Sequence, residues 1–127
     1  MTQQIQLPHN HGNNTAKLLE HIPAEKTFAE ISGTFSLLSD ATRLKILWLL
    51  CHSEDCVINI AAATGMSSPA VSHHLRLLKQ SGLIKSHKEG KEVYYTQADT
   101  TQAILVHKVI DDSFDMDCFK NLGGNKK

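Results

Sequence analysis

The chain has 127 residues, of which 41% are hydrophobic and 20% are charged, a composition typical of one soluble globular domain. The 13 basic and 13 acidic side chains cancel, so net charge alone indicates neither a nucleic-acid nor a membrane partner. Three cysteines, an odd number, argue against a disulfide scaffold, and no segment approaches the ~18 apolar residues of a membrane span. We therefore expect a cytoplasmic protein with no membrane partner.

The sequence predicts one folded domain with polar ends. Residues 1–14 are rich in Gln, Asn and His and lack hydrophobic periodicity, which predicts a mobile N-terminal arm. Residues 15–120 are expected to form the folded domain, and residues 121–127 a loose C-terminal tail.

The first half of the domain shows helical patterns. Apolar residues recur at helical spacing after Pro23, at Phe28, Ile31, Phe35 and Leu38. Asp40 is a suitable N-cap for a helix over 43–51, whose core side chains are expected to be Leu44, Leu47, Trp48 and Cys51. A short helix over 57–64 is expected to end at Gly65.

The second half combines helices with a hairpin. Ser68 as N-cap and Pro69 as the first helical residue predict a helix that ends before Gly82, with Val71, Leu75 and Leu78 facing the core. Strands are expected over 83–87 and 91–96, joined by a turn at Glu89-Gly90. A last helix is predicted over 100–117, with an apolar side of Ala103, Val106, Ile110 and Phe114. The fold class is therefore α+β and mostly α.

The short helix, the turn at 65–68 and the following helix have the pattern of a helix-turn-helix. The second helix would lie in the major groove of DNA, with short side chains at its start that allow close approach. Its expected base-contacting residues are Ser67, Ser68, Ala70, Ser72, His73 and His74, and its expected phosphate-contacting residues are Arg76 and Lys79.

The second helix and the hairpin that follows it form the basic part of the chain. Residues 69–95 carry five Lys or Arg against two acids. We expect this hairpin to act as a wing on the DNA backbone through Lys85, His87, Lys88 and Lys91. One alternative is an ordinary helix pair packed on a hairpin with a solvated charged face. Another is an interaction-only dimer, which would leave the lysines of the wing unexplained.

Three segments resemble one protein family. Leu38-Ser39-Asp40-Ala41-Thr42-Arg43-Leu44-Lys45-Ile46-Leu47, Ser68-Pro69-Ala70-Val71-Ser72-His73-His74-Leu75 and Gly90-Lys91-Glu92-Val93-Tyr94-Tyr95 are similar, in this order, to the ArsR/SmtB family of bacterial metal-sensing repressors. The resemblance implies a homodimeric winged helix-turn-helix, with four or five helices and a β-hairpin wing. It also implies repression by binding double-stranded operator DNA and release by an inducer. Two-fold symmetry suits a palindromic operator.

The family places one sensing site at the start of the helix that precedes the recognition helix. There Cys56 matches the first thiolate, whereas Ile58 and Asn59 replace a second Cys and an Asp. The resemblance implies that further ligands come from the partner's N-terminal arm, which holds His9 and His11. Imidazole and thiolate together suit zinc or a similar divalent ion. The alternative is that Cys56 is a small core residue and the arm a free tail.

A second family site lies on the last helix, where the matching positions are Asp99, Thr101, Asp112 and Asp115. Thr101 is a poor ligand, and three carboxylates form an oxygen-only set that suits zinc poorly. Asp99, Asp112 and Asp115 are therefore a second, weaker candidate site, and a solvated acidic helix end is the alternative. His107 lies outside this pattern and is expected at an interface or on the surface, and His52 is expected to interact with its helix dipole.

Two other functions remain as alternatives. The same fold could sense thiol oxidation or persulfidation through Cys51, Cys56 or Cys118. A small zinc hydrolase is disfavoured because no His-Glu-x-x-His motif is present. We predict a metal-responsive repressor that is not an enzyme.

Overall fold

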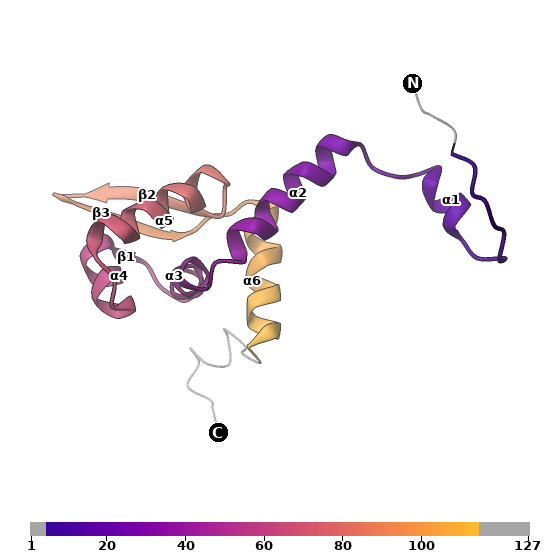
Figure 1. Cartoon of the computed structure of the whole chain (residues 1–127). Helices are drawn as coiled ribbons and strands as arrows, with labels where there is room; N and C mark the ends of the chain where they lie inside the picture. The colour runs from indigo at the N-terminus through magenta and orange to yellow at the C-terminus, as the bar shows by residue number, and fades with distance from the viewer. Residues whose placement is uncertain (1–4, 115–127) are drawn as a thin grey trace, which may run out of the picture. The chain divides into compact units, whose positions relative to one another are not determined.

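The computed structural model describes residues 5–114 (Figure 1). It divides into two compact units, Met1–Gly33 and Thr34–Lys127. The first unit contains α1 (Thr15–Leu19) and the beginning of α2 (Glu25–Leu38), and neither helix has a buried residue. Residues 5–14 of the predicted arm contain no helix or strand. The predicted tail at 121–127, together with Asp115 and Cys118, lies outside the described residues.

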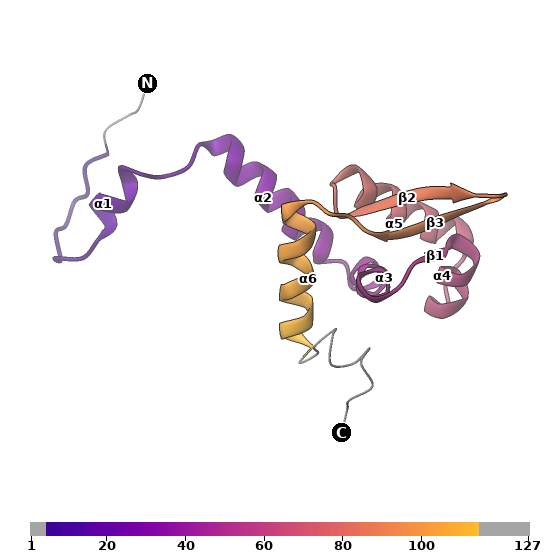
Figure 2. The same cartoon turned by 180° about the vertical axis from the view of Figure 1, so that it is seen from behind.

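The second unit contains five helices or helix segments around a small sheet. After the end of α2 come α3 (Ala41–His52), β1 (Asp55–Cys56), α4 (Val57–Thr64), α5 (Ser68–Gln80), β2 (Ile84–Glu89), β3 (Glu92–Gln97) and α6 (Thr101–Ser113). The sheet is antiparallel with the order β1-β3-β2. The hairpin β2–β3 extends beyond α4 and α5 in both views (Figures 1 and 2).

The predicted α+β class, with a helix-turn-helix and a hairpin, is confirmed. Two elements differ from the sequence prediction. The five-residue helix α1 was not expected, because it has no apolar stripe long enough to show periodicity. The strand β1 was not expected either, because its two residues become a strand only by pairing with Tyr94 and Tyr95 of β3.

Helix α3 begins where Asp40 caps it, since the Asp40 carboxylate accepts a 2.9 Å hydrogen bond from the backbone N–H of Arg43. The predicted core side of this helix is partly wrong. Its fully buried residues are Ile46, Leu47 and Leu50, whereas Leu44, Trp48 and Cys51 are half-buried. Apolar side chains occupy every side of α3, so periodicity alone does not select the face that packs inward.

The core gathers around α3, α4 and α5. Val71, Leu75 and Leu78 of α5 are at most 1% exposed, which confirms the predicted stripe. Helix α6 contributes its buried residues Ala103, Val106 and Ile110, also as predicted. Phe114 was predicted on this apolar side, but it is 53% exposed because α6 ends at Ser113 and Phe114 follows as its C-cap.

Several apolar side chains of α6 face outward. Ile104, Leu105 and Val109 are each more than half exposed, and they lie beside the buried stripe of the same helix. A surface of this kind is typical of an interaction site. Among the described residues, no helix is both long and apolar enough to cross a membrane.

The packing of α4 allows a matched test of the core. Ile60 is 2% exposed and Ile58, on the same helix, is 66% exposed. Replacing Ile60 by Ala removes buried methyl groups and leaves a cavity, so we expect a loss of about 2–5 kcal/mol in the free energy of unfolding. Ile58→Ala should cost less than about 1 kcal/mol. Urea unfolding of both variants measures the difference, and equal losses would contradict the described orientation of α4.

Candidate nucleic-acid interface

The turn between α4 and α5 is set by local chemistry. Gly65 adopts a left-handed conformation with a φ of 69°, which a side chain would disfavour, and it ends α4. The backbone N–H of Met66 then donates to the Ala61 carbonyl at 3.1 Å. The hydroxyl of Ser67 accepts a hydrogen bond from the backbone N–H of Ala70 at 3.2 Å. Ser67, and not Ser68 as the sequence analysis expected, is therefore the N-cap of α5.

Burial of one side of α5 exposes the other. The helix turns its apolar stripe toward the core, so the predicted DNA-contacting residues lie mostly outside it. Those fully exposed are Ser67, Ser68, His73, Arg76 and Lys79, and those half-buried are Ala70, Ser72 and His74. The first exposed residues of this region are short serines, which allow the beginning of the helix to approach base edges. The basic residues follow further along the helix, where contact with phosphates is expected.

The wing presents most of its basic residues to solvent. A two-residue turn joins β2 and β3, where Gly90 has a φ of 65° and Glu89 lies opposite Glu92. Lys88 and Lys91 are exposed beside this turn. Lys85 is also exposed, but its ammonium group lies 2.9 Å from the Asp99 carboxylate, so this lysine is partly neutralised. The tip of the wing is therefore its most available cationic part.

His87, the remaining wing residue of the predicted interface, is half exposed and lies between acidic groups. Its Nδ1 is 3.4 Å from the Glu54 carboxylate and its Nε2 is 3.7 Å from that of Glu89. Its ring stacks on Tyr94 with ring centroids 5.8 Å apart. These contacts orient the imidazole toward the acidic groups, so His87 is a weaker candidate for phosphate contact than Lys88.

The structure adds Arg43, which the sequence analysis did not assign to the interface. Its Nε donates to Nδ1 of His74 at 3.2 Å, and its Nη1 donates to the Leu37 carbonyl at 3.1 Å. Because Nδ1 of His74 accepts this bond, the neutral ring carries its proton on Nε2. Burial, followed by the neighbouring Arg43 charge, holds the pKa of His74 below its usual value. Arg43 therefore positions a side chain of the recognition helix, and together with burial it favours the neutral form of that ring.

The predicted metal ligands lie in different units. His9 and His11 belong to the first unit, where both are exposed and their rings stack with centroids 5.5 Å apart. Cys56 belongs to the second unit, where it is half-buried at the N-cap of α4 and lies opposite Tyr94. The two histidines are thus close to each other, and the thiol has partial access to solvent.

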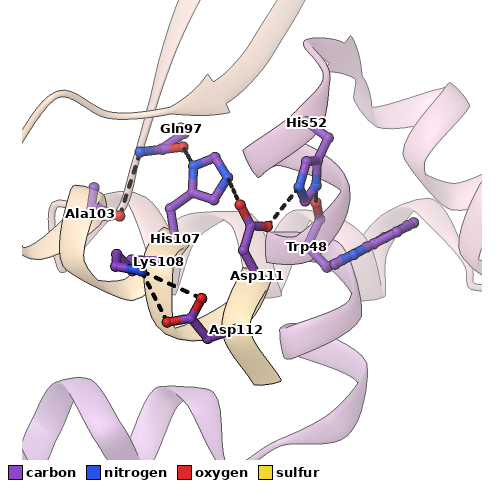
Figure 3. Close-up of polar contacts among 8 residues, drawn as sticks. All are labelled: Trp48, His52, Gln97, Ala103, His107, Lys108, Asp111 and Asp112. Carbon is purple, nitrogen blue, oxygen red and sulfur yellow. Dashed lines mark hydrogen bonds and ion pairs between the residues drawn. The ribbon is translucent and has the colours of Figure 1, made fainter. Parts of the chain in front are cut away.

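Two acidic residues of the weaker candidate site, Asp99 and Asp112, lie among the described residues, and each is paired with a lysine. Asp99 is paired with Lys85, as described above, and Asp112 lies 3.1 Å from the ammonium group of Lys108. These two exposed ion pairs use the charge that a metal ion would need. A different group, His52, His107 and Asp111, comes together between α3 and α6 (Figure 3). The sequence signal for part of it was the spacing of four residues between His107 and Asp111, which places both on one face of a helix.

The geometry is that of a winged helix-turn-helix, and comparisons with known proteins identify the family. The family model described as "Bacterial regulatory protein, arsR family" matches residues 40–86. The cadmium resistance transcriptional regulatory protein CadC of Listeria innocua is 48% identical over 66 residues, which cover 51% of this chain and 56% of that protein. A CadC homolog of Staphylococcus aureus is 42% identical over 86 residues, covering 67% of this chain and 71% of that protein.

A solved structure extends the comparison to the whole fold. It is the homodimeric winged helix-turn-helix DNA-binding domain Mb0332 of Mycobacterium bovis, described as a possible ArsR-family regulator. It has a TM-score of 0.60 at 27% identity and covers 86% of this chain and 91% of that one. The chain belongs to the arsR family of bacterial regulatory proteins. The named relatives are described as transcriptional regulators, the class of protein that the sequence analysis predicts.

The burial of His74 and its contact with Arg43 predict a pH dependence of stability. A folded-state pKa below the usual value means that the unfolded chain binds the proton more readily. The stability that depends on a neutral His74 is therefore present above about pH 6.5, the usual pKa of histidine, and is lost as the pH falls below it. We expect His74→Gln to flatten the decrease in unfolding free energy between about pH 7.5 and pH 5.5.

His21 supplies the control for this measurement. It is exposed and is not among the groups that shift the pKa of His74, so His21→Gln should keep the pH dependence of the parent protein. Urea unfolding at both pH values compares the variants. An unchanged pH dependence in the His74 variant would show that the Arg43 contact does not select the neutral ring.

Proposed function

We propose that this protein is a homodimeric transcriptional repressor that binds operator DNA and is released by a divalent metal ion, zinc or a similar one. The observation that carries the proposal is the capped turn at Gly65 and Ser67, from which α5 projects its polar side outward. The wing then supplies cationic groups beside this helix. The CadC relatives are named as cadmium resistance transcriptional regulatory proteins, which supports a regulatory role and a response to a metal ion.

The proposed DNA contacts divide by chemistry. Ser72 and His73, near the beginning of α5, are suited to donate or accept hydrogen bonds at base edges. Arg76 and Lys79 on α5, and Lys88 and Lys91 on the wing, are suited to phosphate oxygens, whose negative charge does not depend on sequence. The first group would determine which sequence is bound, and the second would supply most of the affinity.

The proposed dimer uses the outward apolar side of α6. Ile104, Leu105 and Val109 would be covered by a second copy of the chain, which removes more than half of each side chain from water. The homodimeric state of the Mycobacterium bovis domain supports this arrangement. Two recognition helices related by two-fold symmetry would then meet two half-sites of a palindromic operator.

The proposed effector site combines Cys56 with His9 and His11 of the other protomer. A thiolate and two imidazoles are good ligands for zinc, cobalt or cadmium. The partial exposure of Cys56 and the full exposure of both histidines leave these groups accessible to an ion. Cys56 also begins α4, the first helix of the helix-turn-helix, so an ion at this thiolate would act directly on the DNA-binding element.

The division of DNA contacts is tested by binding measurements. With an operator selected by the protein from random duplexes, Ser72→Ala and His73→Ala should each weaken operator binding by about fivefold or more and leave random DNA binding unchanged. Lys88→Ala should weaken binding to the operator and to random DNA. It should also lower the slope of the salt dependence of binding by about one. Lys45→Ala removes an exposed lysine outside the interface and serves as the control. Equal losses on both DNAs in all variants would contradict the division.

Release of the protein from operator DNA by Zn²⁺ tests the proposed effector site. Deletion of residues 1–14, and separately Cys56→Ser, should preserve operator binding by the metal-free protein and weaken its release by Zn²⁺, because each change removes ligands. Asp112→Ala should leave the response unchanged, since that carboxylate is paired with Lys108. Fluorescence anisotropy of labelled operator during a Zn²⁺ titration gives the comparison. Normal release in both ligand variants would exclude this site, and release by oxidant or persulfide alone would favour a thiol sensor.

A further inference from the structure

Three metal-ligating side chains outside the proposed effector site converge between α3 and α6. His52 ends α3, and His107 and Asp111 lie one turn apart on α6. The Asp111 carboxylate lies between the two imidazoles (Figure 3), with Oδ1 3.0 Å from Nε2 of His52 and Oδ2 3.1 Å from Nε2 of His107. One ligand atom from each residue lies within 4.8 Å of the others.

The proton on the His52 ring is fixed by the backbone. Nδ1 of His52 lies 2.8 Å from the Trp48 carbonyl oxygen, which can only accept, so Nδ1 carries the proton. In the neutral ring, Nε2 therefore presents its lone pair to Asp111. A lone pair that faces a carboxylate oxygen at 3.0 Å is repulsive, so this contact is favourable only when Nε2 carries a second proton, as in an ion pair, or binds a cation.

The His107 ring is fixed in the same way by Gln97. The Gln97 amide nitrogen donates to the Ala103 carbonyl, so its Oε1 faces His107 and accepts the proton of Nδ1. Nε2 of His107 is then also a lone-pair nitrogen that faces Asp111. This atom is buried and makes no hydrogen bond of acceptable geometry, although a carboxylate oxygen is 3.1 Å away. Such an unsatisfied buried atom calls for a partner.

A metal ion satisfies all of these groups at once. Ligands 2.0–2.2 Å from a tetrahedral ion are about 3.4 Å apart, close to the separations of 3.0 and 3.1 Å between the histidine nitrogens and the carboxylate oxygens. Histidine ligands usually donate their other ring N–H to a carbonyl or carboxylate, as His52 and His107 do here. The nearby Lys108 ammonium is held by Asp112 and so is engaged elsewhere.

We propose that Nε2 of His52, Nε2 of His107 and the carboxylate of Asp111 bind a divalent transition metal ion such as Zn²⁺ or Co²⁺. Two imidazoles and one carboxylate form a donor set of the kind that binds zinc with a fourth position open to water. The set contains no cysteine, draws all its ligands from one protomer and differs from the acidic residues Asp99, Asp112 and Asp115. Trp48 and Gln97 are the positioning groups that hold the rings.

The location gives this site a regulatory consequence, which rests on the proposed function. A metal ion there would join α6, which carries the proposed dimer surface, to the C-terminal end of α3. The N-terminal part of α3 holds the recognition helix through the hydrogen bond from Arg43 to His74. The ion would therefore fix the dimer surface relative to the recognition helix and change the fit of the dimer to operator half-sites.

Cobalt titration of the full-length protein tests the site directly. In a Cys56→Ser background, which removes the other candidate thiolate, we expect one Co²⁺ per protomer with visible d–d absorption that Zn²⁺ abolishes. His107→Gln and Asp111→Asn should each lower Co²⁺ affinity by at least about tenfold, and Gln97→Leu by about 10–100-fold through loss of ring positioning. The controls are Asp112→Asn on the same helix and His21→Gln, an exposed histidine in the first unit.

The outcomes separate this site from the function proposed above. Equal Co²⁺ affinity in the His107, Asp111 and Gln97 variants and in both controls would overturn the site. Circular dichroism checks that each variant folds, and Asp111→Asn retains the shape of the side chain if His107→Gln does not fold. Loss of operator binding by Lys88→Ala with unchanged Co²⁺ binding would support both proposals independently. Zn²⁺ binding that leaves operator affinity unchanged in the Cys56→Ser protein would overturn the regulatory role.

Discussion

The burial of one side of α5 is the constraint on which the DNA-binding surface depends. Val71, Leu75 and Leu78 are packed in the core with almost no exposure, which removes three large side chains from water and contributes several kcal/mol to folding. A helix anchored along this stripe has no rotational freedom, so its polar side must face outward. The position of the proposed base-contacting residues is therefore a consequence of core packing, and a change in the core would also misplace them.

The two proposed metal sites differ in how far their ligands are oriented in advance. His9 and His11 lie on an exposed segment of the first unit, so they would lose conformational freedom on binding an ion. His52 and His107 are already oriented by the Trp48 carbonyl and by Gln97. Preorganised ligands cost less entropy on binding, whereas an arm that becomes ordered can produce a larger structural change. The preorganised site of His52 and His107 therefore favours high affinity for the ion, and the arm site favours a larger structural response to it.

Local signals account for what the sequence predicted well. Gly65 and Ser67 lie at a turn whose chemistry is contained in a few neighbouring residues, so the helix-turn-helix was evident apart from a one-residue shift of the N-cap. The stripe of α5 was predicted because polar residues occupy its other side. The same reasoning failed on α3, where apolar residues surround the helix and tertiary packing selects Ile46 and Leu50.

Contacts between distant segments account for what the sequence did not reveal. Strand β1 exists through its pairing with β3, and the group of His52, His107 and Asp111 depends on the packing of α6 against α3, across 59 residues of chain. His107 was expected at an interface or on the surface, and it lies in part-buried contact with Gln97. Only the spacing of His107 and Asp111 was visible beforehand, and that spacing is common on helices without any metal.

Helix α3 is the element that every proposed function shares. Its beginning is fixed by the Asp40 cap and bears Arg43, which holds the recognition helix through His74. Its end bears His52, which contacts α6 through Asp111. Its middle is buried in the core, so it cannot bend freely between these two points. A displacement of α6 would therefore act on a helix that also holds His74 of α5, and this is the route by which a ligand bound at one end of α3 would affect the proposed DNA-binding surface.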